Sequence, residues 1–291
     1  MRAPRLDVRA LRVRSLDVDR KEVSWEVGDT ADALDFTCQV QRAESPEGPW
    51  SDVSPPFEDH YLFVDARVPA GDKYRVLWYQ VVVTHKATGD VQIYGPASHE
   101  PEPDLMAQAI RRQGMTILSQ ITGRLVWVFK KRTFGPRCSS CWDATTHVVT
   151  RANCPDCFST GFLRGYMNPI EMWCQIDPQG EAQNGATGAR TSFYPNLRPG
   201  DVLVEAENKR WNIVSVNTVE RLRAAIRQEL VLDPIDDTHI LSSLPINLDR
   251  ALRDIQPSPP RMFSLPHDIN SAIEEQTPHI FANYETRPRK P

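Results

Sequence analysis

The sequence predicts a mainly β protein, in which a small sandwich precedes a β-barrel that carries a cysteine-rich insert. Three observations predict this class. The chain has 24 prolines against 14 glycines, and proline disfavours long helices but suits turns and edge strands. Apolar residues alternate with period two through much of the first hundred residues, as in half-buried strands. Two Cys-x-x-Cys pairs, twelve residues apart, lie near the middle of the chain.

Length and composition restrict the protein class. The chain has 291 residues, of which 40% are hydrophobic and 25% charged, as in a soluble globular protein of about two domains. Its net charge of -4 is too small to argue for a nucleic-acid or membrane partner. No apolar run approaches the ~20 residues that span a bilayer, and residues 1–14 lack the apolar stretch of a signal peptide. We therefore expect synthesis in the cytoplasm, no membrane and reduced thiols.

Residues 1–100 are expected to form a sandwich of roughly seven strands. The residues around Trp25 alternate cleanly between apolar and polar. Earlier in the chain the alternation slips once, between Val8 and Leu11, which a β-bulge would absorb. Residues 87–90, Ala-Thr-Gly-Asp, are typical of a hairpin turn.

This region resembles a fibronectin type III domain. Trp25 lies where that family keeps its strand-B tryptophan, and residues 36–42 followed by 48–50 match its C-strand and the next turn. Residues 63–65 match the E-strand, and residues 79–83 match the F-strand with its tyrosine. The resemblance implies a role in adhesion or spacing, without chemistry. The aromatic residues expected in its core are Trp25, Tyr74 and Tyr79.

Residues 101–123 are expected to be a linker that contains a helix. The sandwich ends at Pro101-Glu102-Pro103, and Asp104 can cap a helix that runs to about Gly123. The apolar residues that follow are spaced for a buried stripe. They are Leu105, Met106, Ala109, Ile110, Met115, Ile117, Leu118 and Ile121.

Basic residues gather in and behind this helix. Between Leu105 and Trp142 the sequence has seven basic residues and no acidic one. The simpler interpretation is a solvated face, and the alternative is a surface that meets an acidic protein partner or nucleic acid. The seven are Arg111, Arg112, Arg124, Lys130, Lys131, Arg132 and Arg137.

Residues 124–238 are expected to form a small β-barrel or sandwich, with an insert at about 134–166. Residues 180–188 are small, polar and turn-rich, so we expect a mobile loop there. The expected strands are 125–129, 171–176, 201–205, 210–216 and 227–232.

Residues 239–291 are expected to be an extended, proline-rich tail. They carry little core, and proline recurs throughout, so the segment would be disordered or extended along another subunit. Scattered apolar residues such as Phe263, Ile273 and Phe281 favour docking over free solvation.

Cys138, Cys141, Cys154 and Cys157 have zinc-ribbon spacing and are predicted to hold one structural zinc ion per chain. Two residues between paired cysteines let a tight turn present both sulfurs to one metal at ~2.3 Å. Four thiolates leave no open position for water, so a catalytic zinc is disfavoured. The alternatives are an iron–sulfur cluster and a pair of redox dithiols.

The residues around the cluster refine this prediction. His147 is expected to be an exposed residue of a short β arm, and Cys38 and Cys174 to be buried in strands. Zinc ribbons often place glycine after each cysteine pair, whereas Trp142 and Phe158 stand there in this chain. The segment after the second pair is similar to the glycine-containing repeats of chaperone cysteine-rich domains, of which there is one copy.

The motifs of common enzymes are absent from the sequence. There is no glycine-rich phosphate loop, no Gly-x-Ser-x-Gly, no His-Glu-x-x-His and no cysteine–histidine arrangement typical of a nucleophile. We therefore expect no enzyme, no catalytic residue and no small-molecule substrate.

Residues 166–236 resemble the β-barrels of head-closure and neck proteins of tailed bacteriophages. The segments that carry the resemblance are 198–204, 209–216 and 227–232. It implies a virion structural protein at the neck or head-to-tail connector, made in the host cytoplasm. Such a protein would form a homo-oligomeric ring through its barrel and tail. Its other partners would be the portal and neighbouring neck or tail-completion proteins.

Two other functions remain open. A zinc-ribbon nucleic-acid-binding protein would use the basic residues of 111–137 as its footprint, with affinity that falls steeply with salt. A baseplate or adhesin accessory component would suit the predicted sandwich equally well.

Overall fold

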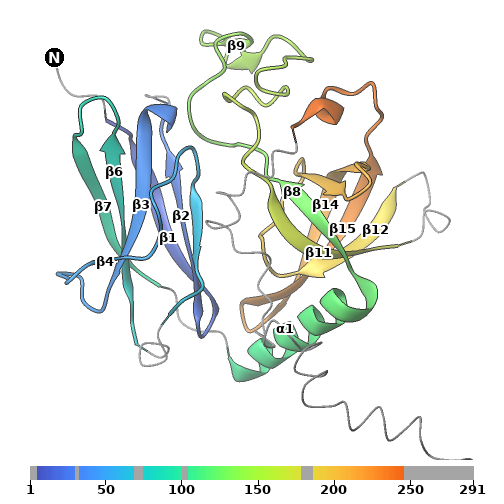
Figure 1. Cartoon of the computed structure of the whole chain (residues 1–291). Coiled ribbons are helices and arrows are strands. Elements are labelled where there is room, and N and C mark those ends of the chain that lie inside the picture. Colours follow the sequence, from blue (N-terminus) through green and yellow to red (C-terminus); the bar gives the residue numbers. More distant parts are fainter. Residues whose placement is uncertain (1–4, 30–32, 69–74, 100–103, 178–185, 246–291) are drawn as a thin grey trace, which may run out of the picture. The chain divides into compact units, whose positions relative to one another are not determined.

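Two antiparallel β structures, a sandwich and a closed barrel, make up most of the described chain (Figure 1). The computed structural model describes residues 5–29, 33–68, 75–99, 104–177 and 186–245. All of these belong to one compact unit, residues 1–259. Tyr74, the Pro101–Pro103 linker and the tail beyond residue 245 lie outside the described residues. No helix within the described ranges is long and apolar enough to cross a membrane.

The sandwich has the roughly seven strands that the sequence predicts. Three form one sheet in the order β1-β2-β5, and four form the other in the order β4-β3-β6-β7. The predicted bulge lies in the first strand, where the register shifts between Arg9 and Arg12 and Ala10 has a φ of 49°. The strands are β1 (Val8–Asp17), β2 (Arg20–Val27), β3 (Phe36–Ala43), β4 (Ser51–Asp52), β5 (Leu62–Asp65), β6 (Trp78–His85) and β7 (Val91–Ser98).

The two sheets share one apolar core. Trp25 and Tyr79, both predicted core residues, are 1% and 0% exposed. The hydroxyl of Tyr79 donates to the Asp65 carboxylate at 3.0 Å, and Arg42 forms an ion pair with the same carboxylate at 2.7 Å. The hydroxyl of the buried Tyr79 therefore has the hydrogen-bond partner that a buried polar group needs.

The predicted helix is present and its cap is confirmed. Helix α1 (Leu105–Ile117) continues into a π-helical turn, η3 (Leu118–Thr122), and the Asp104 carboxylate accepts a hydrogen bond from the Ala107 amide. The predicted buried stripe is only partly correct. Met115 and Leu118 are buried, but other members are exposed. The exposed ones are Leu105, Met106, Ala109, Ile117 and Ile121.

The helix buries a polar face because its arginine has partners there. Gln108 and Arg111 are both 6% exposed. The Arg111 guanidinium donates to the carbonyl oxygens of Ala225 at 2.7 Å and Leu16 at 3.1 Å. It also lies 3.9 Å from the ring centroid of Phe193. The apolar periodicity of this helix therefore does not identify the face that packs on the barrel.

Six strands form a closed antiparallel barrel in the order β11-β12-β15-β14-β13-β8. The sequence left a barrel and a sandwich open for this region, and the closed sheet shows that the barrel is correct. Large apolar side chains fill its interior, among them Met172, Trp211 and Ile213, each at most 1% exposed. The strands are β8 (Arg124–Phe129), β11 (Ile170–Ile176), β12 (Thr187–Ser192), β13 (Val202–Glu205), β14 (Arg210–Arg221) and β15 (Ala224–Pro234).

Strand β12 corrects the expectation of a loop at 180–188. Residues 178–185 lie outside the described residues, but Thr187 and Gly188 are already part of the strand. Thr187, Ala189 and Thr191 are buried and alternate with exposed neighbours. A strand with such small and polar residues lacks the branched and aromatic side chains that mark the others.

The start of the predicted tail packs on the barrel. A short 3-10 helix, η6 (Ile240–Ser243), buries Leu241, and Leu244 beside it is also buried, both against Val202 and Val204 of β13. The expectation that residues from 239 onward carry little core is therefore wrong for 239–245.

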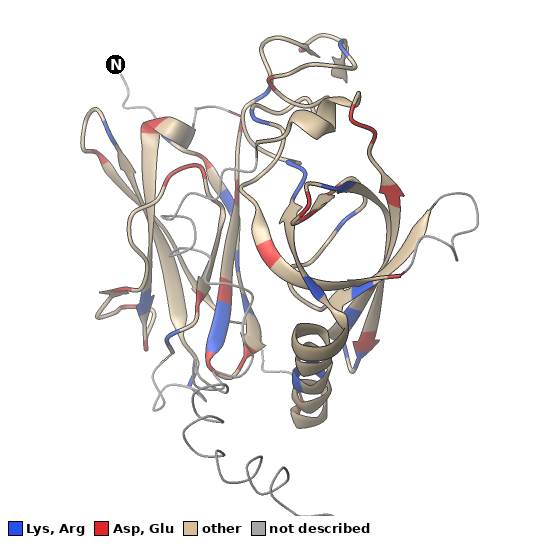
Figure 2. Ribbon diagram, turned by 45° about the vertical axis from the view of Figure 1, so that its right-hand side comes forward, with Lys and Arg blue, Asp and Glu red and all other residues tan. Residues whose placement is uncertain are grey.

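Most of the basic side chains of 111–137 have partners inside the molecule, and Lys131 is the exception among the described residues. Figure 2 shows basic and acidic positions on both the sandwich and the barrel. Arg132 is 2% exposed and forms an ion pair with Asp59 of the sandwich at 2.6 Å. Arg112 pairs with Asp17 at 3.1 Å, and Arg124 pairs with Glu205. The interpretation of this stretch as a solvated face is therefore wrong for the buried Arg111 and Arg132.

Replacement of Asp59 should test the buried ion pair. Asp59→Asn leaves the Arg132 guanidinium buried without a counter-charge, so we expect a loss of ~3–5 kcal/mol in the free energy of unfolding. The exposed Arg75–Glu44 pair supplies the control, because Glu44→Gln should cost at most ~1 kcal/mol. Urea denaturation of both variants measures the difference. Equal, small losses would contradict the role given to Asp59.

Candidate metal centre

The cysteine-rich insert lies between barrel strands β8 and β11, which are hydrogen-bonded neighbours. The chain leaves and returns side by side, because the Met167 amide donates to the Lys130 carbonyl at 2.8 Å and the Arg132 amide to the Gly165 carbonyl at 2.9 Å. These pairings extend the β8–β11 ladder as a stem. The insert can therefore be long without opening the barrel.

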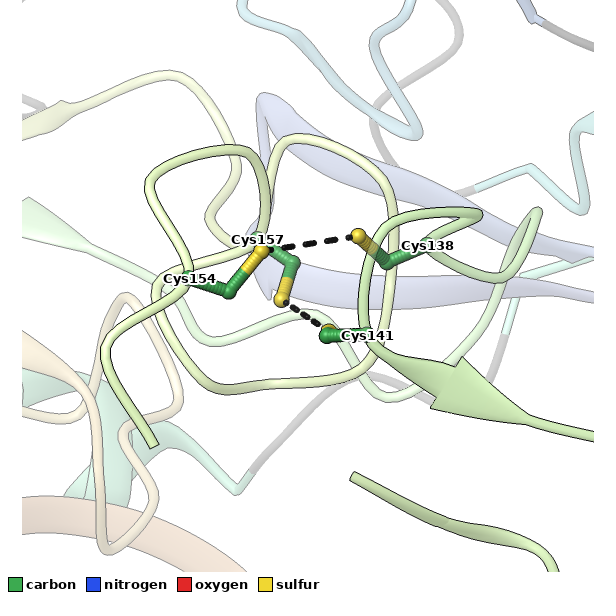
Figure 3. Close-up of side chains that lie close together, drawn as sticks. All are labelled: Cys138, Cys141, Cys154 and Cys157. Carbon is green, nitrogen blue, oxygen red and sulfur yellow. Dashed lines mark hydrogen bonds between the residues drawn. The ribbon is translucent and has the colours of Figure 1, made fainter. Parts of the chain in front are cut away.

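The stem brings the two predicted cysteine pairs together. Cys138 and Cys141 lie before a short hairpin, β9 (Trp142–Asp143) with β10 (Val148–Val149), and Cys154 and Cys157 follow it. Figure 3 shows the four side chains converging. The sulfurs all lie within 4.8 Å of one another, and each cysteine is at most 3% exposed.

The sulfur positions fit a single metal ion. A tetrahedron with ~2.3 Å zinc–sulfur bonds has sulfur–sulfur edges of about 3.8 Å. The Cys138 and Cys154 sulfurs are 3.8 Å apart, and those of Cys141 and Cys157 are 3.1 Å apart. Both contacts join the first pair to the second, as a shared ion requires. The donor set can therefore hold a metal ion and is compatible with zinc.

Two tight turns present the sulfurs. After each pair a backbone amide returns to its first cysteine: Trp142 donates to the Cys138 carbonyl at 3.0 Å, and Phe158 to the Cys154 carbonyl at 2.9 Å. Phe158 has a φ of 50°, in the left-handed region that favours glycine. Phe158 thus adopts the left-handed backbone conformation that suits the glycine usually found at this position of a zinc ribbon.

Burial and hydrogen bonds shift the pKa values of three cluster thiols, and the direction is not the same for all of them. Desolvation raises the pKa of the Cys141 and Cys157 thiols. Desolvation, the largest single effect, also opposes ionisation of Cys154, but hydrogen bonds from the backbone amides of Asp156 and Cys157 and from the Cys157 and Cys141 thiols together lower the pKa of Cys154. Metal binding requires thiolates, and the backbone amides that donate to the Cys154 sulfur favour that form.

The remaining predicted residues of this region lie where the sequence placed them. His147 is exposed and lies outside the sulfur cluster, with its ring 6.1 Å from that of Trp142. Cys38 and Cys174 are buried in β3 and β11. Burial raises the pKa of both thiols to about 12. Neither belongs to the metal centre.

Arg137 is a part of the centre that sequence reasoning missed. Its guanidinium lies 3.9 Å from the ring centroid of Trp142 and 4.0 Å from that of Phe162. Its amide donates to the Asp29 carboxylate at 2.7 Å. A cation held between two aromatic faces stabilises the turn next to Cys138. Its position directly before the first cysteine was the available signal.

Removal of one ligand should open the insert. Cys154→Ser leaves three sulfurs, so we expect release of the metal and loss of its stabilisation, on the order of 10 kcal/mol in such modules. Limited proteolysis should then cut within residues 134–166, and metal analysis should show less than one ion per chain. Cys174→Ala is the control, since Cys174 is buried outside the cluster. Unchanged digestion of Cys154→Ser would contradict a structural metal.

We predict that the end of the insert tolerates no side chain at Gly165. It has a φ of +60°, and a Cβ there would lie 2.2 Å from the Cys157 carbonyl oxygen. We expect Gly165→Ala to displace Cys157 and to make the insert protease-sensitive even in excess metal. Gly114→Ala is the matched control, because nothing lies within 4 Å of that Cβ; it should stabilise the helix by ~0.5–1 kcal/mol. Identical behaviour of both variants would refute the steric explanation.

The four-cysteine cluster and the closed barrel are the two features from which a function can be argued. No protein-family model, curated protein or solved structure matches the chain. Its function is therefore argued from its own chemistry and packing.

Proposed function

We propose that this chain is a non-enzymatic structural protein of a tailed-phage virion, at the neck or head-to-tail connector. In this role several copies form a ring through their barrels and C-terminal tails. The observation that carries the proposal is the closed six-strand barrel formed by the segments that resemble head-closure and neck proteins. The partners are further copies of the chain, the portal, and neck or tail-completion proteins.

The geometry of the resembling segments supports this proposal. Asp201 is 1% exposed, and its carboxylate accepts hydrogen bonds from the amides of Lys131 and Arg198, both at 2.8 Å. Trp211 is 1% exposed and donates to the Glu205 carboxylate at 2.7 Å. The Gly-Asp turn and the tryptophan therefore act as fixed structural points of the barrel.

Zinc has a structural role in this proposal, with one ion per chain. The insert buries its four cysteines, and Val149 is the one partly buried apolar residue packed against them among the described residues. Such a module is too small to be held by apolar burial alone. A four-thiolate ion would fix it as a rigid projection from the barrel.

The sandwich is proposed to be a fibronectin type III-like module. In its support, strands β1, β2 and β5 form one sheet and the other four form the second. Trp25 and Tyr79 are also in the shared core. This module would serve as a spacer or decoration on the outside of the particle.

Exposed apolar residues on α1 and η3 are consistent with the proposed oligomer. Leu105 is 80% exposed, Ile121 75% and Met106 56%. Exposed apolar side chains at both ends of this helical segment could take part in contacts between copies. The alternative of nucleic-acid binding is less well supported, because the internal contacts of Arg111 and Arg132 remove them from the proposed footprint.

Mass spectrometry of purified, nuclease-treated phage particles from the source tests the proposal. We expect peptides of this chain at roughly six to twelve copies per particle, as in a closed ring. About three copies would instead favour a baseplate or adhesin component, which overturns the neck assignment. Absence from particles would overturn the virion role altogether.

A filter-binding assay with DNA separates the remaining alternative. If the chain is a neck protein, its affinity for DNA should be weak at all salt concentrations. Tight binding that falls steeply between 50 and 200 mM salt, as about six or more phosphate contacts require, would favour the zinc-ribbon nucleic-acid-binding protein instead.

A further inference from the structure

A cleft between the sandwich and the stem of the insert has no role in the proposed function. Its volume is about 230 Å³. Apolar side chains form much of its wall, including Trp25 from β2, Phe134 from the insert and Met167 from the returning strand of the stem. Phe134 and Met167 pack on the sandwich core, so both sides of the cleft are held in place. The space suits one or two side chains rather than a whole folded partner.

The cleft carries an excess of positive charge. Five basic residues and two acidic ones line it. Arg14 is paired with Glu22 at 3.0 Å, and Lys130 with Asp201 at 3.1 Å. The basic residues whose side chains form no hydrogen bond or ion pair within the described residues are Arg12, Lys131 and Arg198.

Two buried donors in the cleft also lack acceptors. Trp25 is 1% exposed, and its Nε1–H has no hydrogen-bond partner within the described part of the chain. The same is true of Arg14 Nε. A buried donor without an acceptor costs roughly 1–3 kcal/mol. A ligand with carboxylate oxygens and an apolar body would match the free cations and the apolar wall of the cleft.

We propose that this cleft binds an acidic, apolar-rich peptide, namely residues 268–285 of the chain's own C-terminal tail, supplied by a neighbouring copy. In that segment Asp268, Glu274, Glu275 and Glu285 have no lysine or arginine among them, and the one histidine is His279. Ile273, Phe281 and other apolar residues lie between the acidic ones. An apolar side chain would enter the cleft while neighbouring carboxylates meet the free cations. The inference rests on the proposed function, in which the tail contributes to assembly.

Binding of a labelled synthetic peptide of residues 268–285 tests this inference by fluorescence anisotropy. The protein is the full chain in which the four acidic residues of that segment are replaced by their amides, so that its own tail does not compete. We expect saturable binding that weakens with added salt. Lys131→Glu together with Arg198→Glu should weaken it roughly tenfold or more. Arg223→Glu, in the exposed turn between β14 and β15 and outside the cleft, should leave the affinity unchanged.

Three results would overturn the inference. They are absence of binding, equal weakening by Arg223→Glu, and tighter binding of an 18-nucleotide single strand of DNA than of the peptide. Zero-length cross-linking in the unaltered full chain adds a second measurement, since Lys131 should join a carboxylate of 268–285 within covalent dimers. Cross-links confined to monomers would refute the neighbouring copy as the source.

The peptide assay needs no phage particle, and particle composition does not depend on peptide binding. A chain found in particles whose cleft does not bind the peptide would refute this inference alone. Peptide binding by a chain absent from particles would refute the virion role alone.

Discussion

The buried guanidinium of Arg132 is the point on which the arrangement of this chain depends. It lies in the stem of the insert, where its Nε donates to the Tyr166 carbonyl at 3.1 Å. It also forms an ion pair with Asp59 of the sandwich at 2.6 Å. A second cation, Arg164, pairs with the same carboxylate at 2.6 Å. One acidic residue of the sandwich thus binds both strands of the stem, so the stem's geometry and the position of the sandwich are coupled.

This coupling explains how a barrel tolerates a long insert between two paired strands. The β8–β11 ladder closes the barrel, so any movement of the stem would strain the register of Val128 with Ile170. The four cysteines fix the distal end of the insert, and Arg132 fixes its base. Between them the insert has little apolar core of its own. A metal ion bound by the four cysteines, together with the buried ion pair, would therefore replace the packing that holds the other two parts.

The sequence was informative wherever a local pattern and its packing agree. The slip of alternation near Leu11 was recognisable because a β-bulge is its physical cause. The spacing of Cys138 to Cys157 was recognisable because four sulfurs that are to share one ion need it. Strand β12 was missed because Thr187 and Ala189 are small, and barrel closure rather than β-propensity holds them in a strand. In α1 the apolar period was visible, but Arg111 determines which face is buried, through acceptors that lie far away in the sequence.

The basic stretch shows why charge in a sequence window does not identify a binding surface. Arg132 and Lys131 are neighbours in the chain, yet Arg132 is 2% exposed and paired, while the Lys131 side chain faces the cleft and has no partner among the described residues. The cations that Lys131 joins there, Arg12 and Arg198, come from β1 and from the turn before β13. No continuous segment contains all three. Recognition of an acidic partner at this cleft would therefore depend on the fold, which brings together the charges that internal ion pairs leave over.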